Sequence, residues 1–238
     1  MIIVRNLSMV YGARGVLADV SFDGRPGTIT SIVGRTGCGK STLLQILAGL
    51  RTPSFGSFQC GPHVTYVSQR IALLPWRTAF NNMAIPLEVH GQLTDGNVTR
   101  LRALAHEYGI GDAMGLRPDQ LSGGMRQIVA ILRAFVSPAS VLLLDEPFTA
   151  IDYPLRIKLE DALVRHSRDT NAATLLVTHD LEEALAVSDR IVVLAERPAR
   201  VVENCEVAFF RAADSSLGAR ATSGFVPRLA RLLALLKS

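Results

Sequence analysis

One short segment combines glycines, a lysine and a hydroxyl group in a spacing suited to phosphate chemistry. It runs from Gly34 to Ser41, after the β-branched run Thr28–Val33 and before the helix-like stretch Ser41–Leu50. Glycines let backbone N–H groups approach an anion closely, and a helix start adds unpaired N–H groups. The sequence therefore predicts a triphosphate-binding loop between a strand and a helix.

The segment fits the P-loop pattern GxxxxGK[ST], in the strand–loop–helix context that the pattern requires. We expect Lys40 to reach the β- and γ-phosphates of ATP and the Ser41 hydroxyl to bind Mg²⁺. Cys38 is expected to contribute its backbone and not a reactive thiol. The predicted ATP-binding residues of this loop are Gly34, Arg35, Thr36, Gly37, Cys38, Gly39, Lys40, Ser41 and Thr42.

Acidic residues follow a second apolar run, Val141–Leu144. Because ligands of open α/β sheets collect at the carboxyl ends of the strands, we expect Asp145 to hold Mg²⁺, directly or through water. Glu146 is expected to orient the attacking water, and His179, at the end of a third run, to contact the γ-phosphate. Positioning and charge neutralisation are what phosphoryl transfer needs, so the set predicts a nucleotide hydrolase.

The elements that position these residues alternate between strand-like and helix-like. The continuous apolar runs, which include Leu175–Val177 and Ile191–Leu194, are typical of strands covered on both faces. Strand–helix–strand alternation predicts an α/β fold with a largely parallel sheet. Residues 1–30 and about 55–68 predict short strands in an N-terminal antiparallel β piece. Residues from about 70 to 138 predict a helical insertion, which includes a helical stretch from His90 to Tyr108.

Composition excludes several classes of protein. The chain has 238 residues, of which 48% are apolar and 19% charged, which excludes a disordered or fibrous chain. The longest uncharged stretch, 52–69, is rich in turn residues, so we expect no membrane span. The first residues lack the basic region and long apolar core of a signal peptide, so we expect a soluble, intracellular chain. The net charge is +4, and the arginines are scattered, so no nucleic-acid partner is expected. Three cysteines without metal spacing predict reduced thiols.

A third motif makes the assignment more specific. The segment Leu121–Gln127 reads LSGGMRQ and stands shortly before the acidic strand. It resembles the LSGGQ-type signature of ATP-binding-cassette (ABC) proteins. The rest of that family's set follows in order, including Tyr11, Gln69 and the turn 149–152, and the resemblance spans about residues 1–205.

The resemblance implies roles for further residues. Tyr11 would stack on adenine, the alternative being a core tyrosine, and Gln69 would contact Mg²⁺ and the attacking water. Family members form a head-to-tail homodimer, which suits the two phosphate-binding helix starts of this chain. The signature residues expected to reach the partner chain's ATP are Leu121, Ser122, Gly123, Gly124 and Met125. Asp152 would shape the turn that faces the partner.

The match has departures from the family pattern. Ile128, Leu132 and Phe135 replace the Arg, Ala and Leu that are common in the signature helix, and the turn reads Thr-Ala-Ile-Asp. These apolar changes bear on packing or on the hydrolysis rate. Every side chain expected to contact phosphate is retained, so we expect an active enzyme.

The residues after Gln69 indicate a partner. A Leu74-Pro75-Trp76-Arg77 sequence is a candidate exposed anchor, because Trp and Arg dominate binding hot spots. The alternative is a Trp76 buried in the helical region. The stretch resembles the site where importer ATPases receive a permease, and most closely the nitrate/sulfonate/taurine importer branch. Residues 196–201 resemble the Arg-Pro strand–turn of the same branch, and we expect them to recognise the permease too.

The resemblance thus implies a P-loop, ABC-type nucleotide-binding domain over residues 1–238. Its expected parts are a β subdomain with the P-loop (1–68), a helical subdomain (69–138), a RecA-like core (139–205) and a C-terminal helical extension (206–238). The expected function is ATP hydrolysis, as a homodimer bound to two integral-membrane permease subunits, peripherally at the cytoplasmic face of the inner membrane. An extracytoplasmic solute-binding protein would take part indirectly.

The cargo expected from the branch is an alkanesulfonate, taurine or nitrate. An importer of a vitamin precursor or other small solute, and a soluble ABC ATPase in DNA repair or protein assembly, remain as alternatives.

Overall fold

The computed structural model describes residues 1–207, 213 and 215–237, which form two compact units. The first, here called the core unit, contains Met1–Tyr66, Ser140–Glu146 and Ile157–Ser238. The second, the helical unit, contains Val67–Ala139 and Pro147–Arg156. The four-part division expected from the sequence stays a prediction.

A six-stranded sheet runs through the core unit in the order β5-β6-β7-β3-β8-β9. Its strands are β3 (Ile29–Gly34), β5 (Val64–Val67), β6 (Val141–Asp145), β7 (Ala173–Thr178), β8 (Arg190–Ala195) and β9 (Arg200–Glu206). β3 pairs in parallel with β7 and β8, β6 pairs in parallel with β7, and β9 is antiparallel to β8. The predicted α/β class with a largely parallel sheet is confirmed.

A separate antiparallel sheet of three strands has the order β2-β1-β4. Its strands are β1 (Ile2–Tyr11), β2 (Arg14–Gly24) and β4 (Phe55–Cys60). The antiparallel β piece is confirmed. The strands are longer than the short ones expected, with 10 residues in β1 and 11 in β2.

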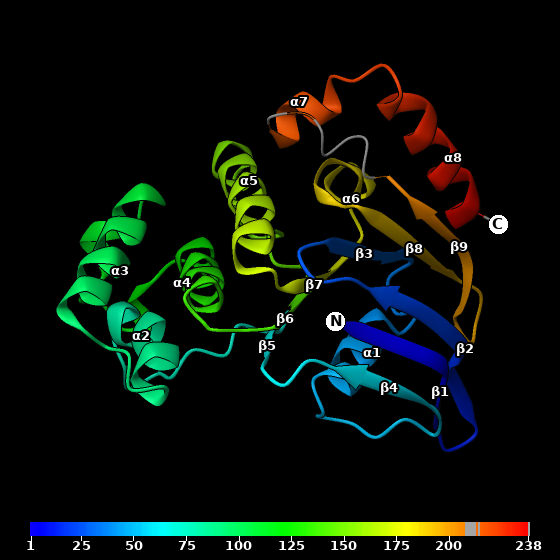
Figure 1. Cartoon of the computed structure of the whole chain (residues 1–238), viewed down its shortest axis with the longest axis horizontal. Helices are drawn as coiled ribbons and strands as arrows, with labels where there is room; N and C mark the ends of the chain where they lie inside the picture. The colour runs from blue at the N-terminus through cyan, green and yellow to red at the C-terminus, as the bar shows by residue number, and fades with distance from the viewer. Residues whose placement is uncertain (208–212, 214, 238) are drawn as a thin grey trace. The chain divides into compact units, whose positions relative to one another are not determined.

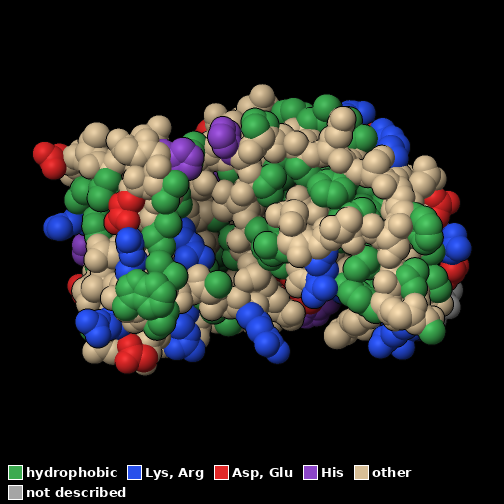
Figure 2. Space-filling model, turned by 90° about the horizontal axis from the view of Figure 1, so that it is seen from below, with side chains coloured by type: hydrophobic (Ala, Val, Ile, Leu, Met, Phe, Trp, Pro, Cys, Tyr) green, Lys and Arg blue, Asp and Glu red, His purple; other side chains and the backbone are tan. Residues whose placement is uncertain are grey.

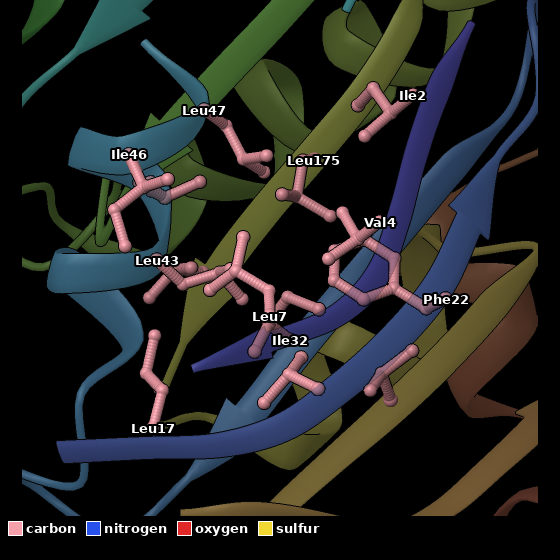
Figure 3. Close-up of a cluster of buried hydrophobic side chains, with 14 of the residues drawn as sticks. Ile2, Val4, Leu7, Leu17, Phe22, Ile32, Leu43, Ile46, Leu47 and Leu175 are labelled. Atoms are coloured by element: carbon pink, nitrogen blue, oxygen red, sulfur yellow. The ribbon is translucent and has the colours of Figure 1, made fainter. Parts of the chain in front are cut away.

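The main hydrophobic core lies where the two sheets meet the first helix, α1 (Lys40–Leu47). Side chains from β1 and β2, including Ile2, Val4 and Leu7, point toward Leu43 of α1 and Leu175 of β7 (Figure 3). The four strands β3, β6, β7 and β8 are almost entirely buried, which explains their continuous apolar sequences. Each fully buried Leu or Ile stabilises the fold by about 1.5–3 kcal/mol, so this core fixes the strand ends that carry polar residues.

The first helix is shorter than predicted. The sequence predicts a helix to Leu50, but α1 ends at Leu47. The backbone N–H of Leu50 bonds back to Gln45 O at 2.9 Å, and that of Gly49 to Ile46 O at 2.9 Å. These bonds close the helix end and reverse the chain, which is the usual way in which orphan carbonyls are satisfied.

Three helices near the C-terminus belong to the core unit (Figure 1). They are α6 (Leu181–Val187), α7 (Ser216–Arg220) and α8 (Phe225–Lys237). α6 packs against β3 and β7, and α8 packs against β8 and α6. Leu232 of α8 is fully buried. Of the expected C-terminal extension, 206–238, positions 208–212, 214 and 238 lie outside the described residues.

The helical unit is built on three helices, α2 (Ala79–Val89), α3 (Asp95–Glu107) and α4 (Gly123–Phe135). α2 packs against both α3 and α4. The predicted helical stretch from His90 to Tyr108 is wrong at its N-terminal end, where the helix begins later than expected. α3 begins at Asp95, because the Thr94 side chain caps it by accepting a hydrogen bond from Asn97 N.

A longer helix, α5 (Tyr153–Thr170), begins in the helical unit and continues into the core unit. Within the described ranges, no helix has the length and apolar character needed to cross a membrane. Cys38, Cys60 and Cys205 are free thiols, as predicted.

A buried ion pair ties α7 to α5 in the core unit. The Arg220 guanidinium donates to Glu160 Oε2 at 2.8 Å and to Oε1 at 3.0 Å, and Glu160 is fully buried. The backbone N–H of Ser216 also donates to Asp161 Oδ1 at 2.7 Å. Two acidic side chains of α5 therefore hold the helix that precedes α8.

We expect Glu160→Ala to lower the free energy of unfolding by about 3–5 kcal/mol, because it leaves the Arg220 charge buried without its carboxylate. The double variant Glu160→Leu/Arg220→Met should recover most of that loss, since neither charge then remains to be desolvated. Urea unfolding of the full chain measures both. A loss below about 1 kcal/mol for Glu160→Ala would contradict a stabilising role for the pair.

Candidate active site

The predicted phosphate loop connects β3 to α1 in the core unit. Gly39 has a φ of +113°, and a Cβ atom built there would lie 2.8 Å from Val16 Cγ1. A side chain at this position would be strained and would also clash with β2, so only glycine fits. The loop is thereby seated directly on the start of β2.

Lys40 begins α1, and its side chain folds back over the loop. Only 5% of it is exposed, and its Nζ donates to Gly34 O at 2.7 Å and to Arg35 O at 3.1 Å. A buried ammonium is costly unless it is hydrogen-bonded, and these two carbonyls supply the bonds. The loop therefore carries a fixed positive charge.

Ser41 and Asp145 are brought together by α1 and β6. Ser41 Oγ donates to Asp145 Oδ1 at 3.2 Å, and the Tyr66 hydroxyl donates to Asp145 Oδ2 at 3.3 Å. Burial raises the pKa of Asp145, while these two hydrogen bonds act in the opposite direction. Tyr66, whose pKa is raised by burial and by Asp145, stays a neutral donor. The sequence analysis missed it.

A hydroxyl beside a carboxylate is the kind of oxygen ligand set that Mg²⁺ prefers. Among the described residues, no group of three or more His, Cys, Asp or Glu side chains has the geometry for a metal ion. Mg²⁺ commonly binds through one or two protein oxygens together with substrate phosphates. Ser41 and Asp145 therefore fit a cation that arrives with a nucleotide.

Glu146 and His179 lie side by side at the ends of β6 and β7. His179 Nδ1 is 3.3 Å from Glu146 Oε2, and Glu146 is largely buried whereas His179 is half-exposed. The backbone N–H of Glu146 donates to Val177 O at 2.8 Å, and its φ of +50° is unusual for this residue type. Such left-handed backbone costs on the order of 1 kcal/mol and clusters at functional sites. A carboxylate and an imidazole thus meet next to Asp145. The contacts expected for them with water and the γ-phosphate stay predictions.

Tyr11 lies at the end of β1 and is 40% exposed, so the alternative of a core tyrosine is wrong. The Arg51 guanidinium lies 5.4 Å from the centre of its ring. An accessible aromatic face fits stacking on a base.

Of the remaining residues of the phosphate loop, Thr36 and Gly37 are exposed, Cys38 is buried, and Thr42 is half-buried in α1.

The signature segment belongs to the helical unit, as do Gln69 and Asp152. Ser122 is the N-cap of α4, and its side chain accepts a hydrogen bond from Met125 N at 3.1 Å. Ser122 and Gly123 are exposed, Gly124 and Met125 are half-buried, and Leu121 is buried. The segment therefore presents a capped helix start with exposed backbone, which suits anion binding.

The three departures from the signature pattern point into the helical unit. Ile128, Leu132 and Phe135 are all buried on α4. They lie well beyond the exposed start of the helix, so they change how α4 packs and not which groups its first turn presents.

The Leu-Pro-Trp segment is held in one conformation by Asn82. This fully buried side chain accepts from Leu74 N at 2.8 Å and donates to Leu74 O at 3.1 Å, Arg77 O at 3.2 Å and Thr78 O at 3.0 Å. Trp76 is 68% exposed, so the alternative of a buried Trp76 is wrong. Exposed hydrophobic side chains beside Lys and Arg are visible on the face drawn in Figure 2.

The flanking residues of this segment differ from the expected set of anchors. Pro75 is exposed and Leu74 half-buried, but Arg77 forms an ion pair with Glu88 of α2. Its guanidinium is therefore already engaged within the helical unit. The segment therefore presents a rigid turn with one exposed indole.

Comparison with known proteins places these features in a family. The sequence pattern of the family described as ABC transporter matches residues 17–149. The nitrate import ATP-binding protein NrtC of Synechococcus elongatus is 43% identical over 197 residues, which cover 77% of this chain and 29% of that protein. The chain therefore spans less than a third of that relative's length.

Two further proteins match over most of their length. The aliphatic sulfonates import ATP-binding protein SsuB 1 of Agrobacterium fabrum is 40% identical over 196 residues, covering 81% of this chain and 70% of that protein. A solved structure of an ATP-binding subunit of an ABC transporter has a TM-score of 0.79 at 27% identity, with all of both chains covered. The motifs, the fold and the relatives agree, and the chain belongs to the ATP-binding subunits of the ABC transporter family.

Proposed function

We propose that this protein is the ATP-hydrolysing subunit of an importer for a small oxyanion or organosulfur solute. The observation that carries the proposal is the cluster at the ends of β3, β6 and β7. There Lys40, Ser41 and Asp145 lie beside the Glu146–His179 pair within one unit. These groups are the ones that phosphoryl transfer to water needs.

Each residue of the cluster has a distinct role in the proposed reaction. The loop N–H groups and Lys40 bind the phosphates, and Ser41 and Asp145 would hold Mg²⁺ in the core unit. Gln69, in the helical unit, stays a ligand expected from the sequence alone. When bound, Mg²⁺ would neutralise part of the negative charge of the phosphate groups. Glu146 accepts the proton of the attacking water, and His179, 3.3 Å away, orients Glu146 and contacts the γ-phosphate.

The signature segment supports a homodimer. One chain carries two phosphate-binding helix starts, at α1 and at α4, and the second is exposed and capped by Ser122. In a head-to-tail C2 pair, each ATP lies between the loop of one chain and the signature of the other. Asp152, exposed before α5, then faces the partner chain.

The exposed turn around Trp76 supports a membrane partner. A rigid indole loses little conformational freedom on binding, which makes it an effective anchor. We propose that Leu74, Pro75 and Trp76 receive two permease subunits, one per chain, at the cytoplasmic face of the inner membrane. The extracytoplasmic solute-binding protein then acts on this subunit only through the permease.

The cargo follows from the relatives alone, because this subunit does not contact the solute. One relative is named for nitrate import and another for aliphatic sulfonates, and both solutes are small oxyanions. An alkanesulfonate, taurine or nitrate is therefore the proposed cargo.

We expect Glu146→Gln to keep ATP binding and to reduce turnover at least about 100-fold, since a general base contributes roughly 10²–10⁴ to the rate. With ATP present the variant should accumulate as a dimer. Phosphate release measures turnover, and native mass spectrometry measures the dimer.

The matched control is Glu182→Gln, which makes the same change at an exposed glutamate near the start of α6. Its turnover should equal that of the wild type. Wild-type turnover in Glu146→Gln would remove this residue from the proposed role.

We also expect Trp76→Ala to abolish most solute uptake while leaving the ATP turnover of the isolated subunit within about twofold, because only the permease anchor is lost. A strain lacking the gene is complemented with wild type or variant, and uptake of labelled nitrate, taurine and an alkanesulfonate is measured. Leu217→Ala, an exposed apolar residue of α7, is the control and should restore uptake.

The same assay decides the cargo. Normal uptake of all three solutes in the deletion strain, with growth depending on a vitamin precursor instead, would overturn the oxyanion assignment. Normal uptake in the Trp76→Ala strain would overturn the proposed permease anchor.

A further inference from the structure

A small cavity beside the phosphate loop is lined by two arginines that the proposed reaction does not use. Its volume is about 240 Å³, and its wall includes Arg14, Val16, Gly37, Cys38, Arg197 and Pro198. Gly37 and Cys38 belong to the phosphate loop. Arg197 and Pro198 belong to the turn between β8 and β9. The cavity therefore joins the loop to a turn that is distant in sequence.

The β8–β9 turn is anchored to β2 by backbone hydrogen bonds. The N–H of Ala199 donates to Val16 O at 2.9 Å, and the N–H of Ala18 donates to Ala199 O at 2.9 Å. Pro198 packs so closely on Gly15 that a Cβ built there would lie 3.2 Å from Pro198 Cβ. Arg197 is thus presented from a fixed position.

Two features place the cavity at the nucleotide. Val16, which holds the turn, also packs under Gly39 of the phosphate loop. Arg14 is the direct cross-strand partner of Tyr11, the residue with an aromatic face suited to a base. The cavity therefore adjoins both the proposed base contact and the proposed phosphate contact.

The charges in this cavity are uncompensated within the described part of the chain. Neither the Arg14 nor the Arg197 guanidinium has a hydrogen-bond, ion-pair or aromatic partner there, and both residues are exposed. Arg200, the first residue of β9, instead has its Nε 3.9 Å from Glu196 Oε2 and does not line the cavity. A guanidinium is well shaped to bind phosphate oxygens through two parallel N–H bonds.

We propose that Arg197, together with Arg14, binds the phosphate groups of the nucleotide and raises its affinity. This inference rests on the proposed function, in which the phosphate loop binds ATP. It also assigns the Arg-Pro turn to the nucleotide and not to the permease, which is the partner expected for residues 196–201 from the sequence.

Titration calorimetry of the full chain with ATP tests this assignment. Arg197→Ala should raise the Kd about five- to tenfold, and Arg197→Lys, which keeps the charge but loses the planar fork, about twofold. Arg200→Ala is the matched control and should leave the Kd unchanged. Because Arg197 is exposed, thermal unfolding should be the same for all four proteins.

The outcomes separate this inference from the function on which it rests. A wild-type protein that does not bind ATP would overturn the proposed function and the inference with it. Wild-type binding with an unchanged Kd for Arg197→Ala would overturn the inference alone. An unchanged Kd accompanied by loss of association with the permease would return the turn to the role first expected for it.

Discussion

The position of one ammonium group organises the candidate active site. Lys40 is buried, and the carbonyls of Gly34 and Arg35 hold its Nζ at 2.7 and 3.1 Å. Those carbonyls reach the Nζ because the loop wraps around the start of α1. The loop can wrap in this way because Gly39 has a positive φ and lies so close to Val16 that only glycine is tolerated there. The buried sheet beneath fixes where β3 ends, and with it the whole loop.

The remaining catalytic groups depend on the same sheet. β7 lies between β3 and β6, and the parallel register places Asp145, Glu146 and His179 at one edge with the loop. The bond from Glu146 N to Val177 O turns the chain out of β6, so that Glu146 meets His179 instead of continuing the strand. Burial in the core thus does more than stabilise the fold, since it sets the separation between the phosphate-binding and water-activating groups.

The sequence predicted the strands and the loop because their signals are local and strong. Continuous apolar runs, a GxxxxGK[ST] pattern and acids at a strand end each follow from elementary packing or electrostatics. The missed features depend on contacts between distant residues. Tyr66 donates to Asp145, Asn82 locks the turn around Trp76, and Arg77 pairs with Glu88. The end of α1 was misplaced because Leu50 continues the apolar spacing although the chain has already turned.

Calorimetry of ATP binding to Lys40→Ala tests the central claim most directly, with Lys158→Ala, at an exposed position on α5, as the control. Loss of a charge that faces the phosphates should weaken ATP binding at least about tenfold, whereas the control should bind as the wild type does. An unchanged affinity in Lys40→Ala would contradict the assignment of this loop as the phosphate site.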